Sequence, residues 1–342
     1  MIKYNSMCNE KKVKIGIDTF GADNGCDIFV EAAKLAIATN DNIELYLYGD
    51  HFLLNNLVKK YSVSNDNIFI VDAKEEIKVD EHPVMALRTK KNSSLYRAGE
   101  DLLNGKIDAL ISAGSTGAIL ALAQLYIKTI EGIKRPAIAT LVPTEKQMCL
   151  VIDSGANMDP ESEWLMQYAL LGSVYFKEMY NKENPRVGLL NVGVEPTKGN
   201  KLILETYGLL SNSKRINFVG NIEARDITKG VCDVLVADGF NGNIFLKTYE
   251  GVSKSLLNVI KKCFKENILT SISALLLKGS LKKFLKKYDA HEYGGAPLIG
   301  CKKLILKCHG NAKKNEIFVC IDQAYNFVNK KLIEKFNNYL KG

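Results

Sequence analysis

The alternation of short apolar runs with longer helical patterns most constrains what this chain of 342 residues can fold into. Typical apolar runs are VKIGID (13–18) and RVGLLNVG (186–193), and a clear helical pattern is ESEWLMQYALLGSVYFKEMY (161–180). Similar runs lie at 43–49, 68–73, 108–114, 137–143, 149–155, 216–221, 234–239 and 303–310. Apolar strands that alternate with helices are typical of a mostly parallel sheet covered on both faces. The sequence therefore predicts a three-layer α/β/α sandwich.

The pattern continues without an internal repeat, a low-complexity linker or a clear boundary. We therefore expect residues 12–342 to form a single α/β domain built from two intertwined subdomains. Residues 1–11 (MIKYNSMCNEK) precede the first apolar run and are expected to be an N-terminal extension. A helical protrusion is expected at about 254–290.

Composition argues against several classes of protein. No uncharged apolar run reaches the length of about 20 residues that spans a bilayer, and no apolar stretch follows the charged N-terminus as in a secretory signal. The eight cysteines are scattered without a C-x-x-C pair, which favours free thiols in a reducing cytoplasm. Neither the cysteines nor the four histidines show the spacing of metal ligands, so we expect no metal.

Charge is unevenly distributed along the chain. The net charge is +8, but residues 254–342 hold 18 lysines, no arginine and 6 acidic residues, which gives this segment +12 and leaves −4 for the rest. A basic C-terminal quarter suggests an anionic partner such as a membrane surface, an acidic protein or a nucleic acid. The alternative is a lysine-rich solvated surface without a specific partner.

Several predicted strands end in glycine mixed with small polar residues. The segments that follow them are TFGAD (19–23), STGA (115–118), ANMDP (156–160), VEPTKGN (194–200), FNGN (240–243) and NAKKN (311–315). Ligands of open parallel sheets bind beyond the carboxyl ends of the strands. Glycine there lets the backbone approach an anion, which exposed N–H groups and a following helix N-terminus can bind. Any one segment can be an ordinary turn, but their recurrence favours an anion-binding edge.

The sequence lacks the signatures of several other sites. It contains no G-x-G-x-x-G fingerprint and no G-x-x-x-x-G-K-[ST] loop, so an ordinary nucleotide site is poorly supported. It also contains no G-x-S-x-G turn for a serine nucleophile. The strand ends therefore offer anion sites without an evident covalent nucleophile.

An ordered set of motifs extends over about residues 13–335. They are IDTFGADNG (17–25), EHPVMALRTKKNSS (81–94), ISAGSTGA (111–118), GIKRPAIA (132–139), DSGAN (153–157), RVGLLNVGVEPTKGN (186–200), GNIEARDI (220–227), VADGFNGNIFLK (236–247), EYGGAPLIG (292–300) and HGNA (309–312). In residues and order, they resemble the phosphate acyltransferase (PlsX) family. Enzymes of that family make acyl-phosphate from acyl-[acyl-carrier-protein] and inorganic phosphate.

The resemblance implies an isocitrate/isopropylmalate-dehydrogenase-like α/β fold with a protruding amphipathic helical hairpin. It also implies a catalytic homodimer that needs no metal, nucleotide or other cofactor and has no nucleic acid partner. The acyl donor would be acyl carrier protein, and the product would enter phospholipid synthesis through a downstream glycerol-3-phosphate acyltransferase. The chain would be cytoplasmic and peripherally associated with the inner face of the cell membrane.

The chain departs from the family pattern in four of these motifs. Ala22 stands where the family usually has glycine, and Val194 where it usually has an acidic residue. Asn241 replaces a threonine, and Asn311 replaces a serine. A role for a carboxylate at position 194 is therefore in doubt. None of the changes removes a backbone donor, so we expect activity to be retained.

The resemblance and the residue chemistry together suggest roles at the strand ends. Phosphate is already anionic at neutral pH, so the enzyme has to desolvate it, aim it and stabilise the oxyanion. Lys198 is expected to pair with phosphate, and Asn191 and Asn200 to donate N–H groups. His309 is expected to protonate the leaving thiolate. The phosphate and substrate site is expected to include Gly114, Ser115, Thr116, Gly117, Asn157, Gly193, Asp238, Gly239, Asn241, Gly242 and Asn243.

These roles have structural alternatives. Lys198 can be a surface lysine, Asn191 and Asn200 can cap turns or helices, and His309 can be a structural residue at a strand end. The basic segment with Arg88, Lys90 and Lys91 suits either phosphate or an acidic carrier protein, but it can equally be a solvated loop.

The segment SISALLLKGSLKKFLKKY (271–288) is a basic amphipathic pattern. Leu277, Leu281, Phe284 and Leu285 follow one helical stripe, with lysines on the opposite side. Such a helix can lie in an anionic membrane interface. The alternative is packing against the chain's own core or a dimer partner.

Two other functions remain open from the sequence. A related phosphotransacetylase would use acyl-coenzyme A and would need a nucleotide pocket, whereas a carrier-protein donor needs a basic docking surface. A non-enzymatic membrane scaffold for lipid synthesis would depend on residues 271–288 alone. Formation of acyl-phosphate with and without vesicles separates the enzyme from the scaffold.

Overall fold

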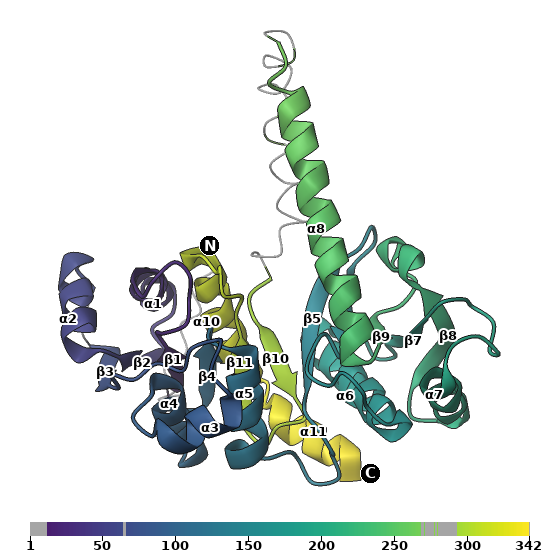
Figure 1. Cartoon of the computed structure of the whole chain (residues 1–342), viewed down its shortest axis with the longest axis horizontal. Coiled ribbons are helices and arrows are strands. Elements are labelled where there is room, and N and C mark those ends of the chain that lie inside the picture. Colours follow the sequence, from purple (N-terminus) through teal and green to yellow (C-terminus); the bar gives the residue numbers. More distant parts are fainter. Residues whose placement is uncertain are drawn as a thin grey trace. The chain divides into compact units, whose positions relative to one another are not determined.

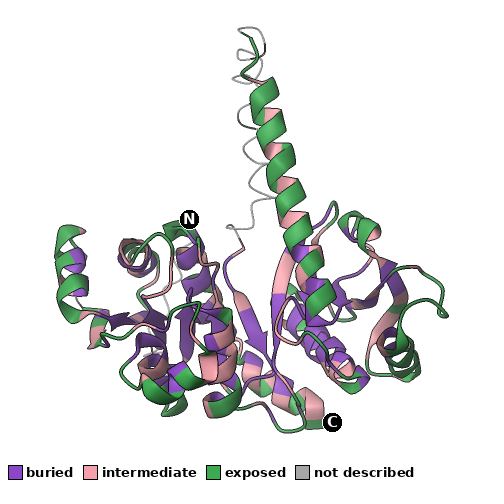
Figure 2. Cartoon of the chain, viewed as in Figure 1, coloured by how far each residue is buried: buried purple, intermediate pink, exposed green. Residues whose placement is uncertain are grey.

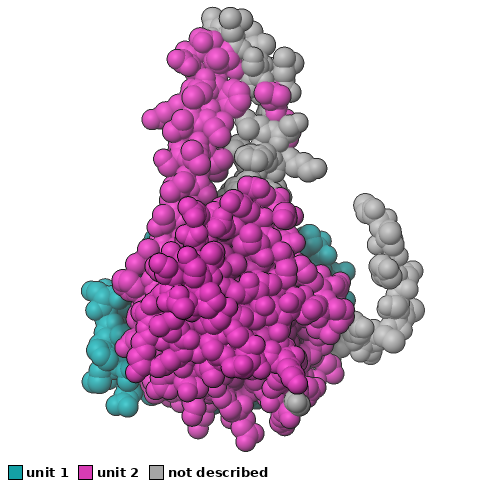
Figure 3. Space-filling model, turned by 90° about the vertical axis from the view of Figure 1, so that its right-hand side faces the viewer, with its two compact units in different colours: residues 1–122, 303–330 teal, residues 123–302, 331–342 magenta. Residues whose placement is uncertain are grey.

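The computed structural model describes residues 12–63, 66–267 and 293–341, together with residues 270, 277 and 279. The chain divides into two compact units (Figure 3). Unit 1 comprises residues 1–122 and 303–330, and unit 2 comprises residues 123–302 and 331–342. Each unit has a sheet covered by helices and is described by itself.

The described sheet of unit 1 is parallel throughout (Figure 1). Its strands, in spatial order, are β3 (Ile68–Asp72), β2 (Ile43–Gly49), β1 (Val13–Asp18), β4 (Ala109–Ser112) and β11 (Leu304–Lys307). The apolar residues of β1 are almost fully buried, as expected for a strand covered on both faces. The register pairs Asp18 with Ser112, and Ser112 with Lys307, so three polar residues end neighbouring strands.

Helices cover the sheet of unit 1 on both faces (Figure 1). They are α1 (Asp27–Thr39), α2 (His51–Lys60), α3 (Pro83–Thr89), α4 (Ser94–Leu103), α5 (Thr116–Leu122) and α10 (Lys314–Asn329). On one face, Tyr48 of β2 donates a hydrogen bond to Asp101 of α4 at 2.9 Å. Gly16 leaves room for Ile107 and for this ring, because a Cβ there would lie 2.3 Å from Ile107 Cδ1 and 3.1 Å from the ring. Helices α1 and α10 pack together on the other face.

The sheet of unit 2 is mixed. Its strands, in spatial order, are β10 (Ala296–Ile299), β5 (Ala137–Pro143), β6 (Met148–Ile152), β9 (Val234–Val236), β7 (Arg186–Asn191) and β8 (Asn217–Glu223). Strand β5 is antiparallel to both of its neighbours, and the other described pairs are parallel. The predicted α/β fold with a mostly parallel sheet is confirmed. The short strand β10 is an addition that the pattern of apolar runs does not predict.

The helices of unit 2 pack on both faces of its sheet. They are η1 (a π-helical turn, Ala123–Ile127), α6 (Ser162–Tyr180), α7 (Lys201–Asn212), η2 (a 3₁₀ turn, Ala224–Lys229), α8 (Gly239–Cys263) and α11 (Leu332–Lys341). Helix α6 packs so closely that a Cβ on Gly172 would lie 2.6 Å from Val234. Because side chains alternate along a strand, Val151 and Leu235 face the opposite side, where they pack with Leu246 of α8.

Helix α8 is long and mostly exposed (Figure 2). Of its 25 residues, only Gly239, Gly242 and Leu246 are buried. It begins well before residue 254, and its later turns extend away from the sheet of unit 2 (Figure 1). Among the predicted membrane contacts, Leu277 is exposed, and Leu281, Phe284 and Leu285 lie outside the described residues. In the part of the chain that the structure describes, no helix is long and apolar enough to cross a membrane.

Candidate active site

In unit 2, the turn after β6 is folded around a buried carboxylate. Asp153 is 0% exposed, and its Oδ1 accepts hydrogen bonds from the N–H groups of Ile138 (3.2 Å), Gly155 (3.0 Å) and Ala156 (2.9 Å). Its Oδ2 accepts two more from Asn157, through the backbone N–H at 2.7 Å and Nδ2 at 2.9 Å. Burial raises the pKa of Asp153, and the N–H donors oppose this effect. The carboxylate therefore fixes the path of the turn.

Asn157, which the sequence assigns to the substrate site, braces this turn in the structure. Its Nδ2 donates to Asp153 and also to the backbone O of Pro136 at 2.8 Å, so the amide hydrogens point into the protein. Its backbone O accepts a hydrogen bond from Gly239 N at 2.7 Å. Asn157 therefore joins the end of β6 to the start of α8 and has no amide hydrogen left for phosphate.

The first turn of α8 packs directly on the Asp153 turn. A Cβ on Gly242 would lie 1.9 Å from the backbone O of Asp153, and a Cβ on Gly239 would lie 2.5 Å from that of Asn157. Asn243 Nδ2 donates to another backbone O of the same turn at 3.2 Å. The two glycines are therefore explained by close packing of helix and turn, whereas the sequence pattern suggests the approach of an anion.

Asp238 and Asn241 cap the N-terminus of α8. Asp238 is 4% exposed, and its Oδ1 accepts a hydrogen bond from Asn241 N at 2.8 Å. Its Oδ2 accepts another from Asn241 Nδ2 at 2.7 Å. Residues 239–243 thus form the first turn of a helix, and Asn241 directs its amide group to the cap.

The segment after β7 is a loop that ends at the N-terminus of α7. Asn191 closes the loop, because its Oδ1 accepts from Val192 N at 2.8 Å and its Nδ2 donates to the backbone O of Lys198 at 3.0 Å. Asn200 is the N-cap of α7, and its Oδ1 accepts from Ile203 N at 3.0 Å. Asn191 and Asn200 therefore close a loop and cap a helix, as in the structural alternative to donating N–H groups to phosphate.

The side-chain donors of Lys198 and Asn200 in this loop have no partner among the described residues. Lys198 is exposed and its ammonium group has no ion pair there. Asn200 is also exposed, and its Nδ2 has no hydrogen bond to any part of the chain that the structure describes. Gly193 packs beside the lysine, because a Cβ there would lie 3.2 Å from Lys198 Cγ. The loop thus offers a cation and an amide donor to a ligand.

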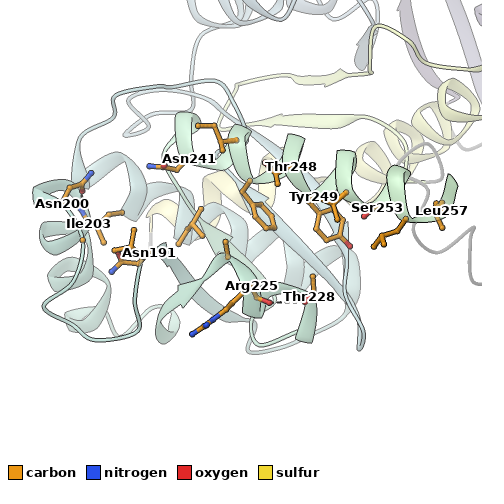
Figure 4. A pocket seen from close by; sticks show the side chains of 18 of the residues that line it. Asn191, Asn200, Ile203, Arg225, Thr228, Asn241, Thr248, Tyr249, Ser253 and Leu257 are labelled. Carbon is orange, nitrogen blue, oxygen red and sulfur yellow. Dashed lines mark hydrogen bonds between the residues drawn. The ribbon is translucent and has the colours of Figure 1, made fainter. Parts of the chain in front are cut away.

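A groove with a volume of about 1020 Å³ begins at this loop and follows α8 (Figure 4). It is lined by Leu190, Asn191, Val192, Gly199, Asn200, Ile203, Ala224, Arg225, Thr228, Asn241, Ile244, Phe245, Thr248, Tyr249, Val252, Ser253, Leu256, Leu257 and Ile260. Asparagine amides gather at one end, and the remaining lining is mostly apolar. Arg225 is the charged residue in this set, and it pairs with Glu223 at 2.8 Å. The groove therefore suits an apolar ligand with a polar head.

In unit 1, the ends of β1 and β4 meet around a second buried carboxylate. Asp18 is 2% exposed and accepts hydrogen bonds from Ser94 Oγ at 2.5 Å and Ser112 Oγ at 2.7 Å. Burial raises the pKa of Asp18, and these hydrogen bonds act in the opposite direction. Gly114 N donates to Ser112 Oγ at 3.1 Å, and a Cβ on Gly21 would lie 2.5 Å from Gly114 Cα. The two turns are therefore packed without room for side chains.

The predicted phosphate cradle at residues 114–117 lies at the start of α5. Ser115 is 8% exposed, and its backbone O accepts the hydrogen bond from Ile119 N at 3.0 Å. Thr116 is the first residue of the helix. A Cβ on Gly117 would lie 2.8 Å from Pro83 Cγ, so α3 packs against this turn. The motifs 81–94 and 111–118 are therefore neighbours in unit 1.

His309 is held by a residue that sequence reasoning missed. Its Nδ1 lies 2.8 Å from Glu316 Oε1, and its backbone N–H donates to the same oxygen at 3.1 Å. The side chain of Glu316 is 0% exposed, whereas that of His309 is 29% exposed. Pairing at Nδ1 fixes the ring and leaves Nε2 on the side away from Glu316. The available signal was an acidic residue in the first turn of the helix that follows HGNA.

Lys307 is a second residue that sequence reasoning missed. It ends β11, and its ammonium group donates to the backbone O of Cys308 and lies 3.5 Å from that of Ala113. This contact brings a partly buried cation beside the turn after β4. A lysine that ends the apolar run KLILK was the available signal.

The basic segment after α3 is only partly available to a ligand. Lys90 Nζ lies 2.6 Å from Glu81 Oε1 and donates to the backbone O of Glu76 at 2.8 Å. Lys91 is exposed, with its ammonium 3.9 Å from the centre of the Tyr96 ring. Arg88 is exposed in the last turn of α3. Lys90 is therefore held by contacts within the protein, whereas Arg88 and Lys91 lie at the surface.

The described side chains provide hydrogen-bond donors, an exposed cation and an apolar groove. Within the described ranges, no three His, Cys, Asp or Glu side chains come together as a metal site. The cysteines in these ranges are free thiols. Such an arrangement can bind an anion and a hydrocarbon chain.

Solved structures share this fold. A phosphotransacetylase from Streptococcus pyogenes superposes with a TM-score of 0.64 at 16% identity, over 94% of this chain and 95% of that chain. At this identity, the likeness concerns the fold alone.

Sequence comparison gives a closer relationship. The model of a family described as fatty acid synthesis protein matches residues 13–335. A phosphate acyltransferase from Clostridium acetobutylicum is 42% identical over 327 residues, which is 96% of this chain and 98% of the relative. A phosphate acyltransferase from Clostridium beijerinckii is 41% identical over 95% of this chain and 98% of the relative. The chain therefore belongs to the phosphate acyltransferase family and is a transferase that moves acyl groups in a reaction involving phosphate.

Proposed function

We propose that this enzyme makes acyl-phosphate from acyl-[acyl-carrier-protein] and inorganic phosphate. A phosphate oxygen attacks the thioester carbonyl carbon, a C–O bond forms and the C–S bond breaks. The thiolate of the carrier leaves and takes up a proton. Phosphate is anionic at neutral pH, so this step needs no protein nucleophile. The protein has to position the reactants, which can lower the barrier by ~7–11 kcal/mol, and to stabilise the oxyanion.

The observation that carries this proposal is the position of two unpartnered donors at the polar end of an apolar groove. The ammonium of Lys198 and the Nδ2 of Asn200 belong to the same loop, and Asn200 lines the groove. An acyl-phosphate has the same two parts, a phosphate and a hydrocarbon chain. We assign Lys198 to charge pairing with phosphate and Asn200 to hydrogen bonding, while the roles of Ser115, Thr116 and His309 remain predictions.

The test is detection of the product. Purified protein is incubated with phosphate and a long-chain acyl-[acyl-carrier-protein], and acyl-phosphate is trapped with hydroxylamine. We expect trapped product that depends on phosphate. A parallel reaction with acyl-coenzyme A tests the phosphotransacetylase alternative. Product from the coenzyme A donor alone would replace the proposed donor, and no product from either donor with folded protein would reject the proposed reaction.

Further partners belong to the same proposal. We propose a homodimer at the inner face of the cell membrane, where a glycerol-3-phosphate acyltransferase would use the product in phospholipid synthesis. The support for the membrane contact is the exposed α8, the 51% exposed side chain of Leu277 and the +12 charge of residues 254–342. Sedimentation with anionic vesicles tests the membrane contact. Replacement of Leu281 and Phe284 by glutamate should abolish sedimentation with the vesicles. Unchanged sedimentation of the folded variant would refute the membrane contact.

A further inference from the structure

The apolar side of α8 is unusually exposed for a helix of a folded protein. Ile244, Val252 and Leu256 all line the groove, and their exposed fractions are 50%, 54% and 58%. They follow the spacing of one helical face, together with the partly buried Phe245 and Tyr249. Exposed apolar surface of this kind marks a binding site.

The floor of the groove is fixed by the core of unit 2. Phe245 and Tyr249 pack against the buried cluster that contains Val142 and Leu235. Tyr249 also donates a hydrogen bond to the backbone O of Pro143 at 2.6 Å. The groove is therefore a preformed feature, and a ligand would not have to order it on binding.

We propose that this groove binds the hydrocarbon chain of the acyl substrate along α8. The thioester or acyl-phosphate group lies at the asparagine end, beside Asn191, Asn200 and Asn241, and the chain extends toward Leu256 and Ile260. The inference rests on the proposed function, because the groove starts at the loop that holds Lys198 and Asn200.

The groove is long enough for this occupant. Asn241 and Ile260 line its two ends, and at the rise of an α-helix they lie about 28 Å apart along α8. One leaflet of a bilayer core, which holds one acyl chain, is about 15 Å thick. A long acyl chain is therefore accommodated with its carbonyl at the asparagines. The apolar lining favours hydrocarbon over a nucleotide, and its one arginine is already paired with Glu223.

The test places a large side chain part of the way along the groove. Side chains on a helix tilt toward its N-terminus, so the indole of Val252→Trp would cover the groove near Thr248, roughly 10 Å from Asn241. The control is Asn258→Trp, an exposed position of the same helix that does not line the groove. Both variants should melt within about 2 °C of the wild type, because both positions are exposed.

The first readout is the ratio of kcat/KM for hexadecanoyl and octanoyl donors on acyl carrier protein. Each methylene that leaves an apolar site lowers kcat/KM about fourfold, so loss of two or more should lower the ratio at least tenfold in Val252→Trp. Both rates of Asn258→Trp should stay within about twofold of the wild type, and the octanoyl rate of Val252→Trp should fall less than its hexadecanoyl rate. The second readout is displacement of a pyrene-labelled fatty acid by palmitate, which needs no turnover. Val252→Trp should weaken it about tenfold.

The outcomes separate the groove from the reaction. If wild-type protein makes acyl-phosphate and Val252→Trp changes neither the chain-length ratio nor the probe affinity, the groove is not the acyl site. A Val252→Trp protein that changes only from dimer to monomer would assign the groove to a second copy of the chain and overturn the inference. Absence of acyl-phosphate in the wild type would overturn the proposed function instead. The affinity of the fatty acid probe for wild type and Val252→Trp would then show by itself whether the groove binds hydrocarbon.

Discussion

Replacement of Asn200 by aspartate separates the two uses of this side chain. The Oδ1 of Asn200 accepts from Ile203 N at 3.0 Å and caps α7, whereas Nδ2 is the donor that we assign to phosphate. Aspartate keeps the acceptor and removes the donor. Loss of an N-cap costs ~1 kcal/mol, but aspartate is as good a cap as asparagine and interacts favourably with the helix dipole. The free energy of unfolding should therefore stay within about 0.5 kcal/mol.

The effect of Asn200→Asp on activity should be large. Removal of one preorganised donor lowers kcat about 100- to 1000-fold, and a new negative charge beside phosphate adds repulsion. We therefore expect kcat/KM for phosphate to fall at least about 100-fold. Asn200→Ala should lower activity and also cost ~1 kcal/mol of stability, because it loses the cap as well.

The assay is hydroxylamine trapping at varied phosphate concentration, combined with urea unfolding of each variant. Asn212→Asp is the matched control, because Asn212 is exposed at the other end of α7 and does not line the groove. It adds the same charge and should leave phosphate kinetics within about twofold. Full activity of Asn200→Asp would refute the assigned role, and loss of stability beyond 1 kcal/mol would refute the reasoning about the cap.

Three further changes test the surrounding structure. Lys198→Met should lower kcat/KM for phosphate about 100-fold or more in the trapping assay and leave thermal melting unchanged, because its ammonium is unpaired among the described residues. Asp153→Asn keeps the Oδ1 acceptor but places an amide against the two donors of Asn157. Urea unfolding should therefore show that the free energy of unfolding falls by ~2–3 kcal/mol, and hydrogen exchange should be faster at residue 157. A fall below about 0.5 kcal/mol would contradict the proposed brace. Burial acts to raise the pKa of Asp233, but hydrogen bonds from Arg186 and Lys182 lower it overall. The stabilisation by ionised Asp233 is therefore present above the ordinary pKa of 3.8 and is lost as pH falls through the folded pKa. Asp233→Asn should lower the free energy of unfolding by ~3 kcal/mol at pH 7 and make it depend less on pH in acid. An unchanged dependence of stability on pH would contradict this.

The fold was predictable because most of its strands are continuous apolar runs. Strands such as β1 and β9 are buried on both faces. A strand of this kind is a continuous apolar run, so the sequence shows it without an alternation of apolar and polar residues. Strand β10 has only four residues, two of them alanine and proline, and no such signal. The antiparallel pairing of β5 with both neighbours was also not predictable from the sequence pattern. The direction of pairing depends on the connections between strands and not on the composition of one strand.

The loops at the strand ends were predictable from the motifs, but the contacts of each side chain were not. The motifs gave the loops, since glycine and asparagine mark strand ends in any α/β sheet. They did not reveal that Gly242 is small because a backbone O lies 1.9 Å from the position of its Cβ. They also did not reveal Glu316, because a carboxylate seven residues after His309 becomes its partner only when α10 turns back over the strand end.

The direction of each amide group decides which asparagines can serve an anion. An anion accepts hydrogen bonds, so an asparagine contributes through Nδ2 and not through Oδ1. Asn157 uses both amide hydrogens within the protein, whereas Asn241 donates one to Asp238 and Asn191 donates one to the loop backbone. Of these four, Asn200 alone makes no hydrogen bond through Nδ2 among the described residues. Lys198 and Asn200 are exposed, so water competes for both donors in the free protein. An acyl chain in the adjoining groove would displace that water, lower the local dielectric constant and strengthen the same two contacts with phosphate at the moment when the thioester is in place.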